Sequence, residues 1–382
     1  MHALVIGAGA FGGWTALHML RAGWKVTLVD AWGAGNSRAS SGGETRVIRG
    51  SYGENGVYTQ MVARSLPLWR ENERRWGRQL LHANGALWMA AADDAWERAS
   101  VKQLRTAGLR FEELDQKELK RRFPQVNFEG LPWAIHELDA GYLLARRACQ
   151  TVVRGFQAEN GSYVQQSAAP GTIARRAMDG VRLADGQVLK ADHYVFAAGP
   201  WLGRMFPDVI GDRIRATRQE IFFFGNPAGD KRFEPEHLPT WVDNSPVRFY
   251  GIPGNEGRGF KIAEDTPGEA FDPTNGDRQV SEKGLASIRE YLGFRFPALQ
   301  DAPLVESRIC QYEMSEDGNL IVDRHPLCDN AWLVGGGSGH GFKLGPALGE
   351  MVARVVMGKA KGEGMFQMER LKGSGTGGRP RK

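Results

Sequence analysis

The sequence is poor in cysteine and has no long hydrophobic run. Its 382 residues include three cysteines, Cys149, Cys310 and Cys328. This small, odd number cannot build a disulfide framework and is typical of a reducing compartment. No stretch approaches the roughly 18 unbroken apolar residues of a membrane span. The chain starts with a strand-like segment and no basic, apolar leader, so we expect a cytoplasmic protein without a membrane contact.

The chain also lacks a concentrated charge of one sign and any zinc-like cysteine and histidine spacing. The formal net charge is +5, but lysine and arginine are interleaved with aspartate and glutamate. We therefore expect no nucleic-acid partner and no metal. The compact basic run at 379–382 follows a glycine-rich stretch, so residues 373–382 are predicted to be a flexible tail.

What the chain does contain is a strand–helix–strand pattern in its first thirty residues. Residues 3–6 and 25–29 are short apolar runs that predict buried parallel strands. Between them a helical pattern ends at Gly23, a typical helix-stopping residue. The loop after the first strand reads Gly7-Ala8-Gly9-Ala10-Phe11-Gly12.

This glycine loop has the spacing of a Rossmann phosphate loop. Gly7 permits the tight turn, Gly9 lets the backbone approach a pyrophosphate, and Gly12 lets helix and strand pack closely. The helix N-terminus then offers free N–H groups to the phosphates. Asp30 ends the second strand, where an acid can bind ribose hydroxyls. The loop predicts a bound dinucleotide, but it does not distinguish NAD from FAD.

The remaining pattern predicts an α/β fold with an α+β insert. Helices are expected over 55–76, 93–106, 115–123, 141–158, 281–292 and 346–357, and buried strands over 194–197 and 331–334. A hairpin is expected at 181–189, and residues 217–262 predict an antiparallel, β-rich region. We expect a discontinuous Rossmann-type domain over 1–80, 141–215 and 318–372, and a substrate domain over 81–140 and 216–317.

Several further segments carry a family resemblance. They are residues 44–49, 195–201, 259–261, 310–312, 317–323 and 337–343, the last reading Gly-Ser-Gly-His-Gly-Phe-Lys. Together they resemble the monomeric sarcosine oxidase and N-methyltryptophan oxidase group of flavoprotein amine oxidases. Fructosyl-amino-acid oxidases and pipecolate oxidases are relatives of that group. The resemblance runs from Met1 to about Leu371.

The resemblance implies that the dinucleotide is FAD. It implies a covalent thioether between Cys310 and the flavin, although a lone cysteine is more often a small buried hydrophobe. Together with the glycine loop and Asp30, the residues expected to contact FAD are Ala31, Ser40, Ser41, Thr45, Arg46, Ala198, Gly199, Trp201, Gly337, Gly339, His340, Gly341, Phe342 and Lys343.

The resemblance also implies roles at the reacting end. Lys261 matches a lysine that activates oxygen, because nascent superoxide needs a fixed positive charge. Arg49 and Lys343 match a pair that clamps the substrate carboxylate. His340 is expected near the flavin, and Tyr250 is expected to line the substrate pocket. Each role has a plainer alternative. Lys261, Arg49 and Lys343 could be ordinary surface charges, His340 could be a structural histidine, and Tyr250 could be a buried aromatic. If 44–49 were helical, Arg46 and Arg49 would share a face.

Two positions depart from the family pattern. Gly42 and Asp265 stand where the family has histidines that shape the sarcosine pocket. We therefore expect a roomier, less cationic pocket and a substrate other than sarcosine.

These features predict an oxidase of secondary or N-substituted amino acids that yields an imine, which hydrolyses, and H₂O₂. We expect a monomer with a small amine or amino-acid substrate and O₂. The alternatives are a flavin dehydrogenase that passes electrons to a carrier, a nicotinamide-linked reductase, and a non-catalytic flavoprotein subunit.

Overall fold

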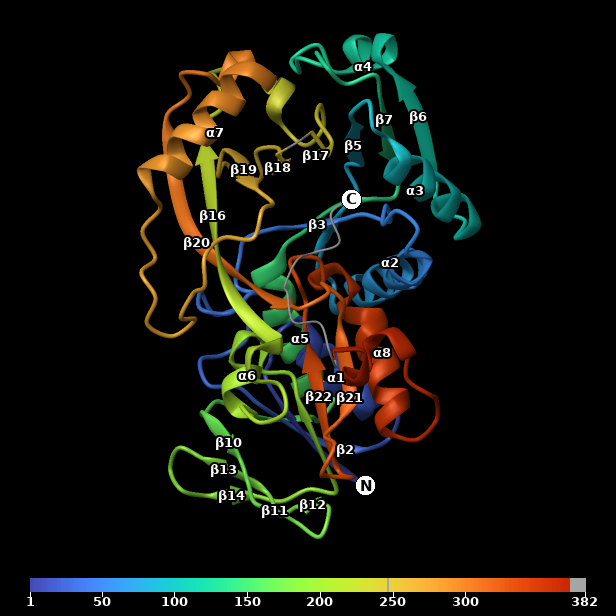
Figure 1. The fold of residues 1–382 in the computed structure, drawn as a ribbon, viewed down its shortest axis with the longest axis vertical. Helices are drawn as coiled ribbons and strands as arrows, with labels where there is room; N and C mark the ends of the chain where they lie inside the picture. Colours follow the sequence, from blue (N-terminus) through green and yellow to red (C-terminus); the bar gives the residue numbers. More distant parts are fainter. Residues whose placement is uncertain (246, 372–382) are drawn as a thin grey trace.

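A six-stranded, mostly parallel sheet forms the lower body of the molecule in Figure 1. The computed structural model describes residues 1–245 and 247–371. The strand order is β21 (Ile321–Arg324), β22 (Ala331–Gly335), β15 (His193–Phe196), β1 (His2–Ile6), β2 (Lys25–Val29) and β9 (Ser162–Val164). Only β21 runs antiparallel to its neighbour. Both faces of this sheet are covered by other parts of the chain. Its strands are therefore continuous buried apolar runs, such as Ala3–Ile6.

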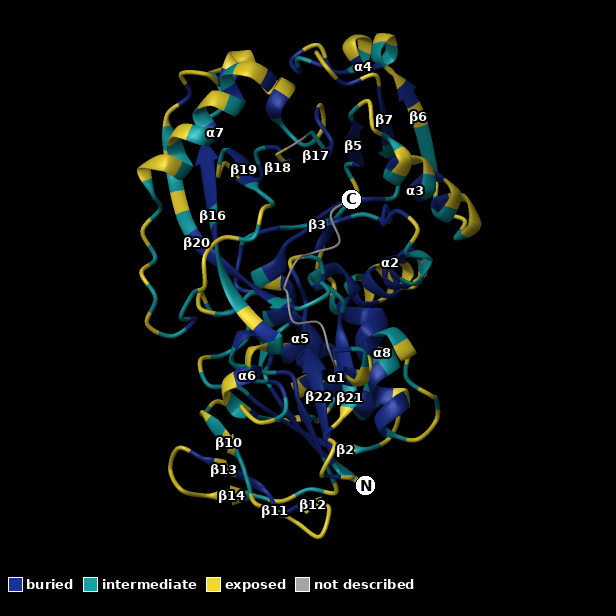
Figure 2. Cartoon of the chain, viewed as in Figure 1, coloured by how far each residue is buried: buried dark blue, intermediate teal, exposed yellow. Residues whose placement is uncertain are grey.

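Four helices pack around this sheet. They are α1 (Ala10–Arg21), α2 (Gly56–Trp76), α5 (Ala145–Ala158) and α8 (Gly345–Val356). α1 packs against both α5 and α8, and α2 packs against α8. Trp14 of α1 meets Trp69 of α2 edge-on, with 5.0 Å between ring centroids. In Figure 2 the central strands and the helix faces turned toward them are buried.

An eight-stranded, mostly antiparallel sheet forms the upper body. Its order is β20 (Leu304–Ser315), β16 (Ile214–Phe224), β19 (Phe260–Glu264), β18 (Phe249–Ile252), β17 (Thr240–Asp243), β5 (Ala86–Ala90), β7 (Trp133–Glu137) and β6 (Phe111–Asp115). α3 (Ala95–Thr106), α4 (Gln116–Arg122) and α7 (Glu282–Arg295) belong to the same body. Aromatic residues such as Trp241, Phe260 and Phe296 fill its core.

The long strands β16 and β20 connect the two bodies. They pair antiparallel from Ile214 with Ser315 to Phe224 with Leu304, and Figure 1 shows them running from the middle of the molecule to its top. A small sheet of β3 (Arg46–Ile48), β8 (Gly141–Leu143) and β4 (Leu81–His82) lies between the bodies. These strands bring residues from distant parts of the sequence to the junction.

The α/β fold class is confirmed, and several local predictions are corrected. The expected helix over 141–158 starts only at Ala145, because β8 pairs with β3 and β4. Residues 46–48 are a strand, so the condition under which Arg46 and Arg49 would share a helix face is not met. The predicted hairpin is present as β13 (Val181–Leu183) and β14 (Val188–Leu189). Asp115 accepts a hydrogen bond from the Glu118 N–H at 2.8 Å, as expected for the start of α4.

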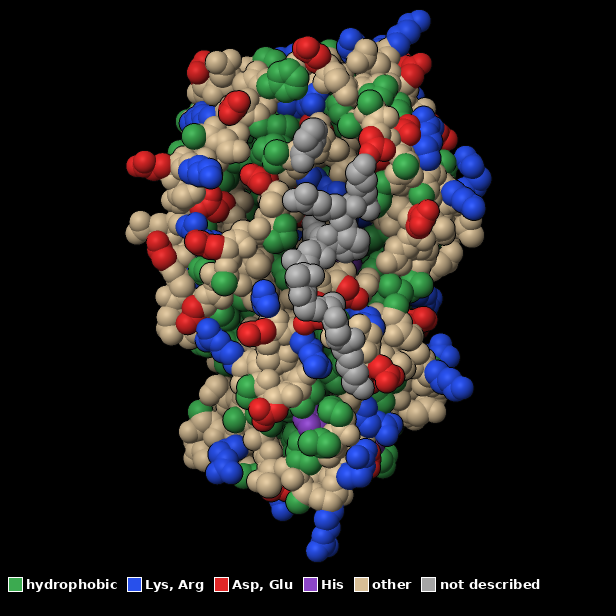
Figure 3. All heavy atoms as spheres, in the orientation of Figure 1, with side chains coloured by type: hydrophobic (Ala, Val, Ile, Leu, Met, Phe, Trp, Pro, Cys, Tyr) green, Lys and Arg blue, Asp and Glu red, His purple; other side chains and the backbone are tan. Residues whose placement is uncertain are grey.

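The remaining short elements lie on the edges of the lower body. They are β10 (Ala168–Pro170), β11 (Ile173–Ala174), β12 (Ala177–Met178) and α6 (Leu202–Met205). No helix among the described residues has the length and apolar character to span a membrane. The tail predicted at 373–382 lies outside the described residues. On the face shown in Figure 3, basic and acidic side chains are interspersed.

Candidate cofactor and substrate site

The glycine loop turns tightly between β1 and α1. Gly7 has φ +106°, and a Cβ there would lie 2.2 Å from the Ala197 carbonyl oxygen. A Cβ on Gly12 would lie 1.8 Å from the Gly7 carbonyl oxygen, so this glycine allows the helix and strand to touch. At Gly9 a Cβ would meet only the Ser41 side chain, at 3.3 Å. Gly7 and Gly12 therefore serve the fold, whereas at Gly9 only the Ser41 side chain would have to shift.

The N-terminus of α1 faces a cavity of about 520 Å³. The Ala10 N–H at the start of the helix donates to Ser41 Oγ at 3.1 Å. Asp30 lines the same cavity and accepts hydrogen bonds from the N–H groups of Ala8 and Gly33, each at 2.8 Å. Burial raises the pKa of Asp30. The cavity therefore contains the N-terminus of α1, which can bind an anion, and an acid directly after the neighbouring strand β2.

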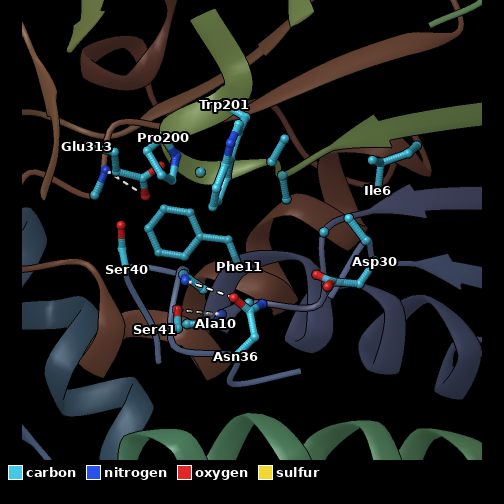
Figure 4. A pocket seen from close by; sticks show the side chains of 18 of the residues that line it. Ile6, Ala10, Phe11, Asp30, Asn36, Ser40, Ser41, Pro200, Trp201 and Glu313 are labelled. Carbon is cyan, nitrogen blue, oxygen red and sulfur yellow. Dashed lines mark hydrogen bonds between the residues drawn. The ribbon is translucent and has the colours of Figure 1, made fainter. Parts of the chain in front are cut away.

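Most of the residues predicted to contact the cofactor line this cavity, which is shown in Figure 4. They are Gly7, Gly9, Ala10, Phe11, Asp30, Ala31, Ser40, Ser41, Arg46, Ala198, Gly199, Trp201, Gly337, Gly339, Gly341 and Phe342. Three buried lining atoms, Ser40 Oγ, Gln166 Oε1 and Glu313 Oε2, have no hydrogen-bond partner among the described residues. A buried polar atom requires a partner, so these atoms fit a polar ligand such as a dinucleotide.

A second cavity, of about 690 Å³, adjoins the first. Four lining residues, Arg46, Tyr312, Gly339 and Phe342, are common to both cavities. The predicted residues Arg49, Tyr250, Cys310, His340 and Lys343 line the second cavity and not the first. The geometry thus separates a cofactor cavity from a substrate-sized cavity, with a shared wall between them.

Arg49 is held between two aromatic rings at the second cavity. Its guanidinium carbon lies 4.6 Å from the Tyr52 ring centroid and 4.5 Å from that of Trp88. The guanidinium also donates to the Ser51 carbonyl oxygen. These contacts preorganise a planar cation that can bind a carboxylate through two N–H groups.

Lys343 is a buried cation near Arg49. Its Nζ donates to the His340 carbonyl oxygen at 2.8 Å and lies 5.3 Å from the Tyr52 ring centroid. Burial, followed by repulsion from Arg49, holds the pKa of Lys343 well below its usual value. A ligand carboxylate would favour the charged lysine and raise this pKa again.

Cys310 and Lys261 lie close to Arg46, which is one of the four residues of the shared wall. Arg46 Nη2 donates to Cys310 Sγ at 3.1 Å and to the Ser40 carbonyl oxygen at 2.5 Å. Lys261 lines neither cavity, because its Nζ donates to the Thr45 carbonyl oxygen at 3.0 Å and to Thr45 Oγ1 at 3.2 Å. Burial and then repulsion from Arg46 lower the pKa of Lys261 to about 7. Thr45 therefore contacts the lysine and not the cofactor cavity.

His340 and Tyr250 both line the second cavity. The His340 ring lies edge-on to Tyr58, with 4.8 Å between centroids, and its Nε2 is 3.0 Å from the Gly318 carbonyl oxygen. Burial raises the pKa of Tyr250 to about 12, so this phenol is neutral. Both side chains can shape the cavity, and His340 has the packing of an ordered structural group.

The expectation for Gly42 is wrong, whereas Asp265 does line the second cavity. Gly42 lines neither cavity, and a Cβ there would lie 1.8 Å from the Asn36 carbonyl oxygen. Asp265 accepts a hydrogen bond from the Tyr312 hydroxyl at 3.1 Å and lies 3.7 Å from Arg248. Arg248 is a further cation at this cavity, beside Arg46, Arg49 and Lys343.

The wall residues that sequence reasoning missed include Trp88, Arg248, Glu313, and Tyr312 as a residue of both cavities. No sequence motif marks Trp88 or Arg248. Trp88 lies on β5 and Arg248 lies in the turn before β18, and only the folded sheet brings them to the second cavity. Glu313 had one available signal, since it is an acid that stands between Tyr312 and Met314 in the sequence.

A Rossmann-type sheet whose glycine-loop cavity adjoins a second, cation-lined cavity defines a dinucleotide-dependent oxidoreductase. Comparison with protein families matches residues 2–355 to the family described as DAO, FAD dependent oxidoreductase. The chain belongs to this family, and its cofactor is FAD.

Relatives and solved structures agree with this assignment. The chain is 29% identical to monomeric sarcosine oxidase of Streptomyces avermitilis, over 96% of this chain and 97% of that protein. It is 27% identical to N-methyl-L-tryptophan oxidase of Citrobacter koseri, over 94% and 95%. The fold matches L-proline dehydrogenase from P. horikoshii with a TM-score of 0.85 at 18% identity, covering 97% of each chain.

Proposed function

We propose that the protein is an FAD-dependent oxidase of secondary or N-substituted amino acids. The imine product hydrolyses in water, and O₂ is reduced to H₂O₂. The observation that carries the proposal is the shared wall, which joins a glycine-loop cavity to a second cavity containing Arg49 and Lys343. Relatives named sarcosine oxidase and N-methyl-L-tryptophan oxidase support the same reaction class.

Arg49 and Lys343 bind the substrate carboxylate in this proposal. Arg49 supplies a fixed, stacked guanidinium, and Lys343 supplies a compact second cation once the carboxylate arrives. The surrounding positive charge lowers the pKa of the substrate amine, so the neutral amine is bound. His340 and Tyr250 complete the wall and orient the substrate.

FAD, when bound, supplies the two-electron redox chemistry that amino-acid side chains lack. The residues that would hold it are the glycine loop, Asp30, Ser40, Ser41 and the turns at 197–201 and 337–342. Lys261 is a cation held behind the shared wall by Thr45. Its positive charge stabilises negative charge that develops on oxygen.

Cys310 is proposed to carry the flavin covalently. Its Sγ is at the second cavity, next to Arg46, which donates a hydrogen bond to it. The guanidinium holds the sulfur, which is the nucleophilic atom of cysteine, in position through this hydrogen bond. The cysteine thus has the partner and the position that a thioether to the flavin needs.

The proposal also covers the domain boundaries, the oligomeric state and the compartment of the protein. We assign residues 1–80, 141–215 and 318–372 to the FAD-binding domain, and residues 81–140 and 216–317 to the substrate domain. We propose that the protein acts as a cytoplasmic monomer.

The oxidase and the dehydrogenase alternative differ in their electron acceptor. Purified protein is mixed with N-methyl amino acids in air, and H₂O₂ is measured beside the reduction of an artificial dye. An oxidase forms H₂O₂ in equal amount to the imine product without dye. Rapid dye reduction with negligible H₂O₂ would instead establish a dehydrogenase.

A further inference from the structure

A buried carboxyl group lies inside the cofactor cavity without a cationic partner. Glu313 of β20 is 7% exposed and lines the first cavity. No ion pair of the described residues includes it. Its Oε1 accepts one long hydrogen bond, from the Gly337 N–H at 3.3 Å, and its Oε2 accepts or donates none among the described residues.

The geometry of β20 directs this carboxyl group toward the cofactor. Side chains alternate along a strand. Cys310 lines the second cavity, Gln311 and Glu313 line the first, and Tyr312 lines both. In Figure 4 Glu313 and Ser40 lie at one end of the view and Asp30 lies at the other.

Two glycines make room for the carboxyl group. A Cβ on Gly337 would lie 2.7 Å from Glu313 Oε1, and a Cβ on Gly199 would lie 3.3 Å from Oε2. Gly199 also has φ +55°. These glycines follow β15 and β22, at the carboxyl edge of the parallel sheet where such folds bind their ligands. The carboxyl group is therefore built into the cofactor cavity.

Because no cation offsets its charge, burial favours the neutral form of the group. Burial raises the pKa of Glu313 to about 7, and only the Gly337 N–H opposes this effect. A neutral carboxyl group carries one O–H donor, which needs an acceptor when it is buried. The phosphate and ribityl oxygens of FAD are acceptors of that kind.

We propose that Glu313 binds FAD as a protonated carboxylic acid, donating its O–H to an oxygen of the cofactor. Loss of the proton would remove this donor and place a carboxylate beside an anionic ligand. FAD affinity is therefore highest below the pKa of Glu313 and falls as the pH rises through it. The inference concerns the cofactor and does not depend on which amine is oxidised.

Other titratable groups line the two cavities or lie on elements next to β20, and the test must separate their titration from that of Glu313. The groups on or next to the neighbouring elements are Asp30 directly after β2, Arg46 on β3, Arg204 on α6, Arg215 on β16, Tyr312 on β20, Lys261 on β19, and His340 and Lys343 after Gly337. Of these, Lys261 also has a pKa near neutrality, about 7.

The experiment measures FAD affinity in the full chain carrying Cys310→Ala, which frees the cofactor. FAD binding is titrated by flavin fluorescence from pH 6 to 9, in this parent and with Glu313→Gln added. The parent's Kd should rise roughly tenfold for each pH unit above about 7. The Gln variant keeps an N–H donor without a titrating proton, so its Kd should stay within about threefold of the parent's pH 6 value.

Glu306→Gln is the matched control, because Glu306 lies on the same strand and pairs with Arg258 away from both cavities. It should reproduce the parent's pH dependence. Infrared spectra of the wild-type holoenzyme should contain a protonated carboxylic acid band that Glu313→Gln removes and Glu306→Gln retains. A flat pH profile in the parent, an equal slope in the Gln variant, or an unchanged infrared band would overturn the proposal.

Discussion

The burial of Lys261 lowers the free energy of unfolding, because a buried ammonium group loses its hydration. Its pKa is lowered from 10.5 to about 7, so the unfolded chain binds more protons than the folded one between these pH values. The free energy of unfolding consequently rises with pH across that window.

Replacing Lys261 by Met should slow the reaction with O₂ by about 10²- to 10³-fold, as expected when one preorganised charge is lost. Flavin reduction by substrate should change little. Because the lysine is protonated below its pKa of about 7, wild-type reoxidation should slow as pH rises through that value, and the Met variant should show no such step. Stopped-flow measurement of the separate half-reactions checks this.

The exposed Lys25 gives a control, because Lys25→Met removes the same charge far from both cavities. Equal slowing of flavin reduction and reoxidation in Lys261→Met would argue against the oxygen role.

Arg49 is stacked between Tyr52 and Trp88, and lysine cannot reproduce this arrangement. Arg49→Lys should raise KM for the amino-acid substrate by roughly 10- to 100-fold, because a charged hydrogen bond contributes about 1.5–3 kcal/mol. Steady-state kinetics provide the measurement. Arg64→Lys, which alters a surface pair with Glu350, should leave KM unchanged. An unaltered KM in Arg49→Lys would exclude the clamp.

At the level of elements, local patterns predicted the fold best. The β1–α1–β2 unit follows from a glycine loop and short apolar runs, all within thirty residues. The start of α5 was predicted wrongly because Gly141, Tyr142 and Leu143 are recruited into β8 by partners more than fifty residues away. Helical periodicity along 141–158 contains no information about those partners.

The site was predictable only where the sequence carries a compact motif. The turn at 337–343 was found in this way. Glu313 was missed because the cavity it faces depends on the pairing of β16 with β20. Gly42 was wrongly expected at the substrate pocket because its packing against the Asn36 carbonyl depends on the folded loop and not on the local sequence. Alignment to a pattern identifies a position but not the wall that its side chain contacts.

Different glycines of the phosphate loop serve folding and cofactor binding. Gly12→Ala places a methyl group against the Gly7 carbonyl and should destabilise the fold by about 1–3 kcal/mol or more. Gly9→Ala meets only a serine side chain, so the melting temperature of the FAD-free chain should be nearly unchanged while FAD affinity falls. Thermal unfolding and FAD titration test the pair. Equal destabilisation by both substitutions would contradict the distinction.

At the scale of the whole molecule, β20 joins the two bodies and carries both Cys310 and Glu313. FAD attached at Cys310 would connect this strand to a phosphate loop about three hundred residues earlier in the chain. The holoenzyme would then be a single unit in which neither body binds the cofactor alone.

Acid precipitation tests the tether. Wild-type protein should stay yellow after denaturation, and Cys310→Ala should release its flavin into the supernatant. Cys328→Ala is the control, because that cysteine is buried in another cluster of the lower body. Free flavin released from the wild type would rule out the thioether.

The most direct test of the central claim is anaerobic mixing of the holoenzyme with N-methyl and cyclic amino acids while the flavin absorbance is followed. An oxidase of secondary amino acids should lose its oxidised-flavin band with one equivalent of substrate, and regain it with one equivalent of H₂O₂ when O₂ is admitted. A flavin that dithionite reduces but that stays oxidised with every secondary amino acid would contradict the account.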